Sequence, residues 1–177
     1  MGTARLEHRA TLLPNNKVLI TGGRNGSPLT STASAEIYDP ALNSYSTRTM
    51  STPRYYHTST RLSDGRILIA GGETDQAEIY NSGVGSFVPA ASMAVSRTQH
   101  TATLLPNGKV LVAGSVGPPS AELYDPVSGI FSPVGDLVIQ RMVHEAVLLP
   151  DGTVLLCGGL WGSPVHLSSS EIFRPAP

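Results

Sequence analysis

The sequence predicts an all-β fold assembled from four copies of one four-stranded unit, and three observations carry this prediction. A phrase that begins with histidine recurs along the chain at intervals of 49, 43 and 44 residues, starting at His8, His57, His100 and His144. Periodicity on this scale is typical of architectures in which one supersecondary unit is repeated. The 18 glycines, 14 prolines and only 14% charged residues suit many short strands joined by turns. Each copy also contains a continuous apolar run.

The first strand of each copy follows its histidine and ends at a tight turn. We expect these first strands at Ala10–Leu13, Thr58–Leu62, Ala102–Leu105 and Ala146–Leu149. The turns that follow carry Asn15-Asn16, Asp64-Gly65, Asn107-Gly108 and Asp151-Gly152. These residue pairs are strong hairpin signals because Asn, Asp and Gly tolerate positive φ.

The second strand of each copy is nearly all apolar. We expect these strands at Val18–Thr21, Ile67–Ala70, Val110–Ala113 and Val154–Cys157. A continuous apolar run indicates burial on both faces of the strand. Cys157 occupies the same small, buried position as Thr21, Ala70 and Ala113, so its thiol is interpreted as packing. Glycine ends each of these strands, in most copies as a doublet.

The third strand carries a Glu, an aliphatic residue and an aromatic residue, and the fourth is centred on an aromatic residue. The third strands contain Glu36-Ile37-Tyr38, Glu78-Ile79-Tyr80, Glu122-Leu123-Tyr124 and Glu171-Ile172-Phe173. The fourth strands contain Tyr45, Phe87 and Phe131, and the last copy has none. An arginine precedes each histidine by three residues, at Arg5, Arg54, Arg97 and Arg141. The units are therefore expected at about 5–50, 54–93, 97–137 and 141–177, within one domain over 1–177.

The glycine doublet, the third-strand Tyr, the fourth-strand aromatic and the Arg-x-x-His lead-in together resemble the kelch repeat, of the bacterial, galactose-oxidase-like type. The fourth-strand aromatic is typically Trp in that family, and it is Tyr or Phe here. The resemblance implies a β-propeller, in which blades of four antiparallel strands surround a central channel. Four blades then form an open arc or part of a larger ring. Three arrangements remain open: a piece of a longer propeller, a closed four-blade ring, and a homodimer in which two arcs complete one ring.

The recurring histidines, arginines and glutamates are interpreted as structural, because each repeats together with its blade. A buried histidine normally satisfies a backbone or side-chain partner. We expect the arginines to pair with Glu36, Glu78, Glu122 and Glu171, either within a blade or between blades.

The segment Arg54–His57 resembles the part of galactose-oxidase-like enzymes in which an adjacent Tyr and His bind copper. The resemblance implies an alternative function, the propeller portion of a copper radical oxidase or of another kelch-type enzyme. Tyr56 and His57 would then be copper ligands, since phenolate and imidazole suit Cu(II). No tyrosine matches the residue that those enzymes cross-link to cysteine, so the sequence predicts no catalytic residue, no metal and no cofactor.

The loops after the glycine doublets differ most between copies; they are long at 24–34 and 160–169 and short at 73–76 and 115–120. In kelch domains these loops share one face with the lead-ins, where partners commonly bind. That face would offer Arg24, Asn25, Tyr55, Tyr56, Asp75, Trp161 and His166. Trp, Tyr and Arg are the residue types that anchor interfaces. The sequence therefore predicts a non-catalytic binding scaffold that recognises a protein or a glycan.

Charge and composition limit the kinds of partner and the cellular locations that the sequence allows. With a net charge of -1 and no basic patch, the sequence does not predict a nucleic-acid partner. No apolar run approaches the length of a membrane span. The single Cys157 excludes an intrachain disulfide, and the first residues show no signal-peptide core. Similar bacterial repeats often belong to exported proteins, so an extracellular or exported location is an expectation, and the compartment stays open.

Overall fold

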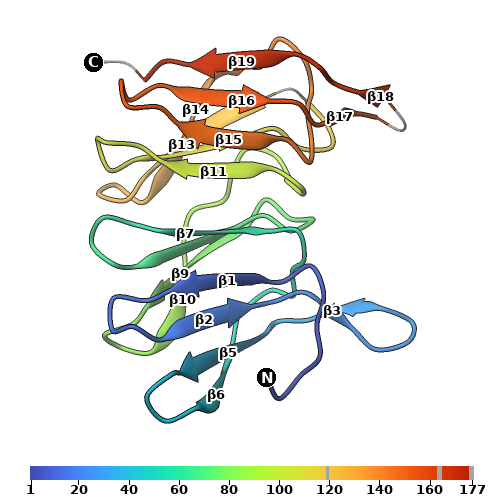
Figure 1. Cartoon of the computed structure of the whole chain (residues 1–177). Helices are drawn as coiled ribbons and strands as arrows, with labels where there is room; N and C mark the ends of the chain where they lie inside the picture. Colours follow the sequence, from blue (N-terminus) through green and yellow to red (C-terminus); the bar gives the residue numbers. More distant parts are fainter. Residues whose placement is uncertain (119, 163–164, 176–177) are drawn as a thin grey trace.

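The predicted all-β architecture is confirmed. The computed structural model describes residues 1–118, 120–162 and 165–175. In these ranges each repeat forms one antiparallel sheet of three or four strands, which we call a blade (Figure 1). Three of these blades have four strands, and the last has three. The end of the fourth predicted blade, 176–177, lies outside the described residues. Within these described ranges, no helix is long and apolar enough to cross a membrane.

Each blade is a meander of consecutive strands, in which the first strand is innermost. Blade 1 contains β1 (Arg9–Leu12), β2 (Val18–Thr21), β5 (Ser34–Asp39) and β6 (Ser44–Thr49). Blade 2 contains β7 (Thr58–Arg61), β8 (Ile67–Ala70), β9 (Ala77–Asn81) and β10 (Ser86–Pro89). Blade 3 contains β11 (Thr101–Leu104), β12 (Val110–Ala113), β13 (Ser120–Asp125) and β14 (Ile130–Asp136). Blade 4 contains β15 (Glu145–Leu148), β16 (Val154–Cys157) and β19 (Ser170–Phe173). The expected second strands agree with β2, β8, β12 and β16, and the expected first strands differ by single residues at their ends.

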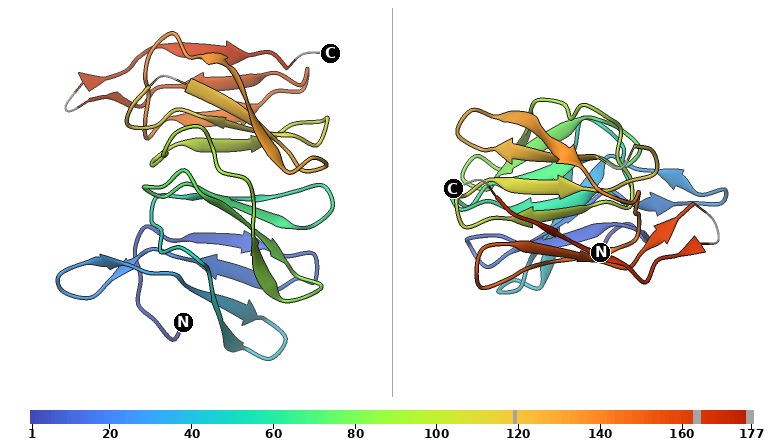
Figure 2. Two further views of the ribbon diagram at one scale, coloured as in Figure 1. Left: turned by 180° about the vertical axis from the view of Figure 1, so that it is seen from behind. Right: turned by 90° about the horizontal axis from the view of Figure 1, so that it is seen from above.

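Two short hairpins occupy segments that were expected to be irregular loops. β3 (Arg24–Asn25) pairs with β4 (Thr30–Ser31), and β17 (Leu160–Trp161) pairs with β18 (Val165–His166). Strands of two residues are too short to produce a hydrophobic period in the sequence. Both hairpins project from the same side of the blades, as Figures 1 and 2 show from different directions.

The four blades form an open arc. The innermost strands β1, β7, β11 and β15 lie side by side in chain order, so each blade neighbours the next (Figure 1). β1 and β15 lie at the two ends of this row, with β7 and β11 between them. Of the three arrangements considered above, the closed four-blade ring is therefore wrong.

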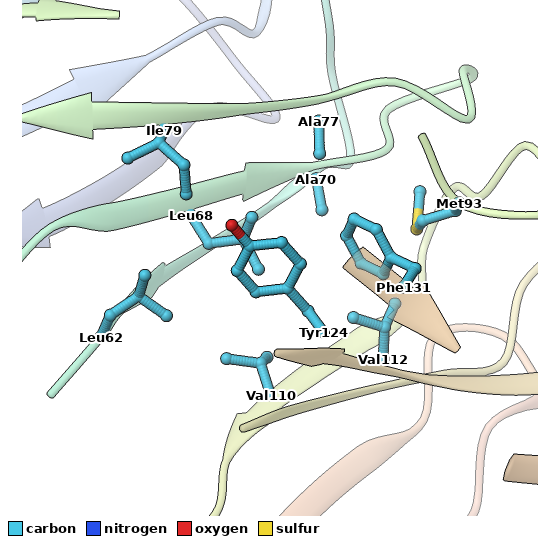
Figure 3. Packing of buried hydrophobic residues seen from close by; sticks show 10 residues of the cluster. All are labelled: Leu62, Leu68, Ala70, Ala77, Ile79, Met93, Val110, Val112, Tyr124 and Phe131. Carbon is cyan, nitrogen blue, oxygen red and sulfur yellow. The ribbon is translucent and has the colours of Figure 1, made fainter. Parts of the chain in front are cut away.

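Neighbouring blades pack face to face through apolar side chains. Between blades 2 and 3, Leu68 and Ile79 face Val110, Tyr124 and Phe131, and all five are buried (Figure 3). Similar clusters join blade 1 to blade 2 and blade 3 to blade 4. Because each inner blade is covered on both sides, its second strand is apolar at successive positions rather than at alternate ones.

The glycine doublets allow the blades to approach this closely. A Cβ on Gly71 would lie 2.7 Å from the carbonyl oxygen of Arg97 and 2.6 Å from Cε1 of His100, both in the lead-in of the next blade. A Cβ on Gly72 would lie 2.6 Å from Cβ of Arg54, in the lead-in of its own blade. Both glycines also have positive φ, 70° and 91°, which L side chains rarely adopt. The first glycine of the doublet therefore leaves room for the lead-in of the next blade, and the second leaves room for the lead-in of its own blade.

The recurring arginines and glutamates form buried pairs within each blade, as expected. Nη2 of Arg54 lies 2.9 Å from Oε1 of Glu78, and Nη1 of Arg54 donates to the carbonyls of Gly71 and Gln76 at 2.6 and 2.9 Å. The side chains of Arg54 and Glu78 are 0% and 2% exposed. The equivalent pairs are Arg5–Glu36, Arg97–Glu122 and Arg141–Glu171. Each pair ties a lead-in segment to the third strand of its blade.

The recurring histidines join blades to each other. Nε2 of His57 lies 2.8 Å from Oγ1 of Thr21 in blade 1, and Nε2 of His100 lies 3.0 Å from Oγ1 of Thr58 in blade 2. His144 makes the equivalent contact across the next interface. Burial, together with the charge of the neighbouring arginine, lowers the pKa of His57 and of His100 from 6.5 to about 3. These imidazoles are therefore neutral cross-links at neutral pH.

We predict that Glu78→Gln destabilises the fold strongly. The substitution leaves the buried guanidinium of Arg54 without a counter-charge, which typically costs about 3–5 kcal/mol. Urea unfolding would measure this loss. Asp64→Asn is the matched control, because the Asp64–Arg66 pair is partly exposed and such pairs contribute about 0–1 kcal/mol. Equal midpoints for Glu78→Gln and the wild type would contradict the structural role of the pair.

We also predict that the protein loses stability as the pH falls below about 6.5. In the unfolded chain a histidine takes up a proton near 6.5, whereas folded His57 and His100 resist protonation down to about 3. Between these values the unfolded state binds more protons, so each histidine costs about 2 kcal/mol at about pH 5. Urea unfolding between about pH 7 and pH 5 would measure the slope. His100→Gln should reduce it, and His166→Gln, at an exposed position, should not.

Candidate functional site

The lead-ins of all four blades converge on an axial cavity on the side that carries the hairpins. The cavity has a volume of about 340 Å³. Its lining includes Glu7, Arg9, Tyr56, Gln99 and Glu145, which together come from every blade. Side chains from the whole arc meet at this cavity, and most of the residues that line it are polar or charged.

One backbone position repeats around this cavity with a different side chain in each blade. The residue before each histidine has a positive φ: Glu7 60°, Tyr56 52°, Gln99 54° and Val143 53°. Positive φ is uncommon outside glycine and is a genuine outlier for a β-branched residue. The amide of Tyr56 donates to the carbonyl of Glu7, that of Gln99 to Tyr56 and that of Val143 to Gln99, at 3.3, 3.2 and 2.9 Å. This backbone series holds four unlike side chains at the cavity.

A charged and aromatic cluster lies beside the cavity, between blades 1 and 2. The guanidinium of Arg24 forms a two-pronged ion pair with Glu7, whose Oε1 lies 2.6 Å from Nη2 of Arg24. The same guanidinium carbon lies 4.3 Å from the ring centroid of Tyr55 and 6.0 Å from that of Tyr56. The two tyrosine rings are 5.4 Å apart, and the hydroxyl of Tyr55 donates to Glu73. We call these five residues the Arg24 cluster.

The charges of the Arg24 cluster reinforce each other. Hydrogen bonding from Arg24, helped by Tyr56, lowers the pKa of Glu7 although burial opposes this shift. The hydrogen bond to Glu73 raises the pKa of Tyr55, and the hydrogen bond to Glu7 raises that of Tyr56. Both tyrosines therefore keep their hydroxyl protons at neutral pH and can act as donors. The cluster is held by its own contacts before any ligand arrives.

The other residues expected on this face are placed apart from the cluster contacts. Asn25 follows Arg24 in β3 and is half-buried, and Asp75 is exposed in a loop of blade 2. Trp161, which is 54% exposed, and His166 belong to the β17–β18 hairpin of blade 4. Trp161 lines an apolar hollow of about 390 Å³ that is formed by blade 4 and the lead-in to it, through the residues Val138, Ile139, Gln140 and Leu167. It forms a second, separate feature of the face.

Sequence reasoning found Arg24, Tyr55 and Tyr56 but missed Glu7 and Glu73, which fix their positions. Glu7 could have been found, because it directly precedes a recurring histidine at a position where the residue differs in every copy. Glu73 gave no such signal, since it follows a glycine doublet in a loop of variable length.

The residues around Tyr56 and His57 do not fit a copper centre. Tyr56 lines the axial cavity, whereas the imidazole of His57 is fully buried between blades with Nε2 engaged by Thr21. In the part of the chain that the structure describes, no three His, Cys, Asp or Glu side chains come together in a way that could hold a metal ion. The adjacency of these two residues in the sequence does not bring their donor atoms to one site.

Comparison with known protein families gives a match over part of the chain. The family model of the kelch motif matches residues 8–48, which span the first repeat from its histidine into β6. No curated protein matches the chain. The matched stretch contains the glycine doublet, the third-strand Glu-Ile-Tyr and the fourth-strand aromatic. Blades 2 and 3 repeat this order, with Ser115 in place of the second glycine in blade 3, and blade 4 repeats it as far as its third strand.

We predict that Arg24→Gln raises the pKa of Glu7 towards its ordinary value of 4.5. The substitution removes the guanidinium that stabilises the carboxylate. An NMR titration of the side-chain carboxyl carbons would follow the change. Arg66→Gln is the control, because Arg66 pairs with Asp64 in the β7–β8 turn, at the opposite end of the strand from the Tyr56 lead-in. A pKa of Glu7 that is the same in wild type and Arg24→Gln would contradict the described electrostatics.

Proposed function

We propose, from the premise that this chain is a kelch-repeat protein, that it is a non-catalytic binding scaffold whose hairpin-bearing face recognises a protein or a glycan. The blades supply a rigid support, because buried Arg–Glu pairs and apolar clusters fix the lead-ins and the strands. Loops held on such a support are the usual place for recognition. The repeated residues already make contacts within and between the blades. The residues that do not recur are therefore the ones available to contact a partner.

The Arg24 cluster is the observation that carries this proposal. Its arginine and two tyrosines are residue types that dominate binding energy at interfaces. Glu7 and Glu73 hold Arg24 and Tyr55 in place, so little side-chain freedom remains to be lost on binding. Because Glu7 neutralises Arg24, the cluster offers two mutually tilted aromatic rings and phenol hydroxyls rather than a net positive charge. Such a surface suits a sugar ring or a peptide segment better than a phosphate.

The β17–β18 hairpin supports a second contact region on the same side. Trp161 is the only tryptophan of the chain, and the hollow beside it is largely apolar. An exposed tryptophan next to an apolar hollow is typical of an anchor point. A ligand that spans the face could therefore contact blades 1, 2 and 4 together.

The oxidase alternative is not proposed, because no observation favours it. The hydroxyl of Tyr56 hydrogen-bonds to Glu7 at the axial cavity, whereas Nε2 of His57 is engaged by Thr21 between the blades.

We predict that a ligand found by screening glycans and displayed peptides against the wild-type chain binds through the Arg24 cluster. Tyr55→Ala and Arg24→Ala should each weaken binding about tenfold or more, as expected for interface anchors. Calorimetry or surface plasmon resonance would measure the change. Arg66→Ala, in the turn at the other end of blade 2, should bind as the wild type does. Ligands that bind equally to all these variants, or a screen without specific ligands, would contradict the proposal.

A further inference from the structure

The outward face of blade 4 carries an exposed apolar row. Val147, Leu155 and Ile172 are cross-strand neighbours on β15, β16 and β19, so their side chains lie in one line across one face of the sheet. Val147 is 51% exposed and Ile172 is 49% exposed. The alternate residues Val154 and Leu156 are buried, since they face blade 3.

The same row is covered in the preceding blades. In blade 1 the equivalent pair is Leu19 and Ile37, which are 0% and 6% exposed because blade 2 packs on them. In blade 2 the equivalent pair is Leu68 and Ile79, which are 1% and 4% exposed beneath blade 3 (Figure 3). The sequence of blade 4 thus contains the receiving half of a blade-to-blade contact.

The outward face of blade 1 carries the other half. Leu12, Val18, Tyr38 and Tyr45 are cross-strand neighbours on β1, β2, β5 and β6. Leu12 is 54% exposed and Tyr45 is 44% exposed. The equivalent row in blade 3 packs onto blade 2, and it consists of Leu104, Val110, Tyr124 and Phe131. The two aromatic pairs even have similar geometry, with ring centroids 4.9 Å apart in blade 1 and 4.8 Å apart in blade 3.

The polar parts of the contact are also divided between the two ends of the arc. A Cβ on Gly114 would collide with Arg141 and His144 of the next lead-in, whereas among the described residues a Cβ on Gly158 of blade 4 would meet only the carbonyl of Leu167, at 3.8 Å. Within the described part of the chain, no lead-in therefore occupies the space beside Gly158 that Arg141 and His144 occupy beside Gly114. Among the described residues, the axial backbone series begins at the carbonyl of Glu7 and ends at the amide of Val143.

We propose that a second copy of this chain docks blade 1 onto blade 4, head to tail, and repeats the contact that joins blades 2 and 3. The occupant is a second copy because the exposed face of blade 4 fits a blade of this repeat pattern, and blade 1 presents such a face, exposed, among the described residues. The hydroxyls of Thr58 and Thr101 contact Nε2 of the histidine of the next blade, and Glu145 occupies the equivalent position in blade 4. His8 of the second copy would then face a carboxylate, which can accept a hydrogen bond from an imidazole N–H. A head-to-tail contact can close into a two-fold dimer or continue as a series.

Sedimentation velocity and native mass spectrometry of the purified chain test this proposal. We expect a dimer or a longer series that dissociates on dilution. Ile172→Arg on blade 4 and Leu12→Arg on blade 1 should each abolish the assembly, because each places a charge in one half of the contact. Val127→Arg is the matched control, since Val127 is 95% exposed and lies in the β13–β14 turn, outside both rows.

A mixing experiment distinguishes head-to-tail docking from pairing of like faces. The Ile172→Arg chain keeps an intact blade 1 face, and the Leu12→Arg chain keeps an intact blade 4 face. An equimolar mixture should therefore form a one-to-one heterodimer, although neither variant assembles alone. A wild-type chain that is monomeric at every concentration would overturn the proposal, and so would a Leu12→Arg chain that still assembles. Circular dichroism verifies folding, and Val147→Arg and Tyr45→Arg replace any variant that does not fold.

Discussion

The packing of one blade face on the next is the contact on which the rest of this structure depends. Each blade is a thin sheet that is apolar on both sides, so it buries its second strand only against neighbours. The close approach requires glycine where Gly71 and Gly72 meet two lead-ins. The same approach buries Arg54 and His57, which leaves the arginine paired to Glu78 and the histidine neutral. Apolar packing, glycine geometry and buried charge are therefore consequences of one arrangement.

This arrangement also separates support from recognition. Residues that recur in every blade are consumed by contacts within and between blades. The position before each histidine shows the separation most clearly, because its backbone conformation recurs while its side chain changes from Glu7 to Tyr56, Gln99 and Val143. The backbone is strained at this position in each blade. In return, four side chains that vary independently are held around one cavity. The Arg24 cluster extends from two of these four positions.

The sequence predicted what repeats far better than what does not. The first and last residues of all four second strands were predicted correctly. Four aligned apolar runs, each bounded by a turn and a glycine, leave little choice of strand ends. The buried pairs of Arg54 and its equivalents followed from the same recurrence. The β3–β4 and β17–β18 hairpins were missed, since two-residue strands have no period. Cys157 was expected to be buried like Ala113, yet it is half-buried because the outward face of blade 4 is uncovered. Side-chain partnerships such as Tyr55 with Glu73 depend on loop conformation, which no pattern in one sequence encodes.

The open ends of the arc connect the scaffold to the candidate site. The backbone series that positions Tyr56 and Gln99 runs from blade to blade, and it ends at Val143, in the lead-in to β15 of blade 4. A docked blade 1 would bring another Glu7 next to Val143, together with another Arg24 cluster. The axial cavity would then gain a wall on its open side, and the number of cluster sites on the face would double. Because two linked weak sites bind a repeating ligand much more tightly than one, assembly and recognition on this face would be coupled through the same backbone series.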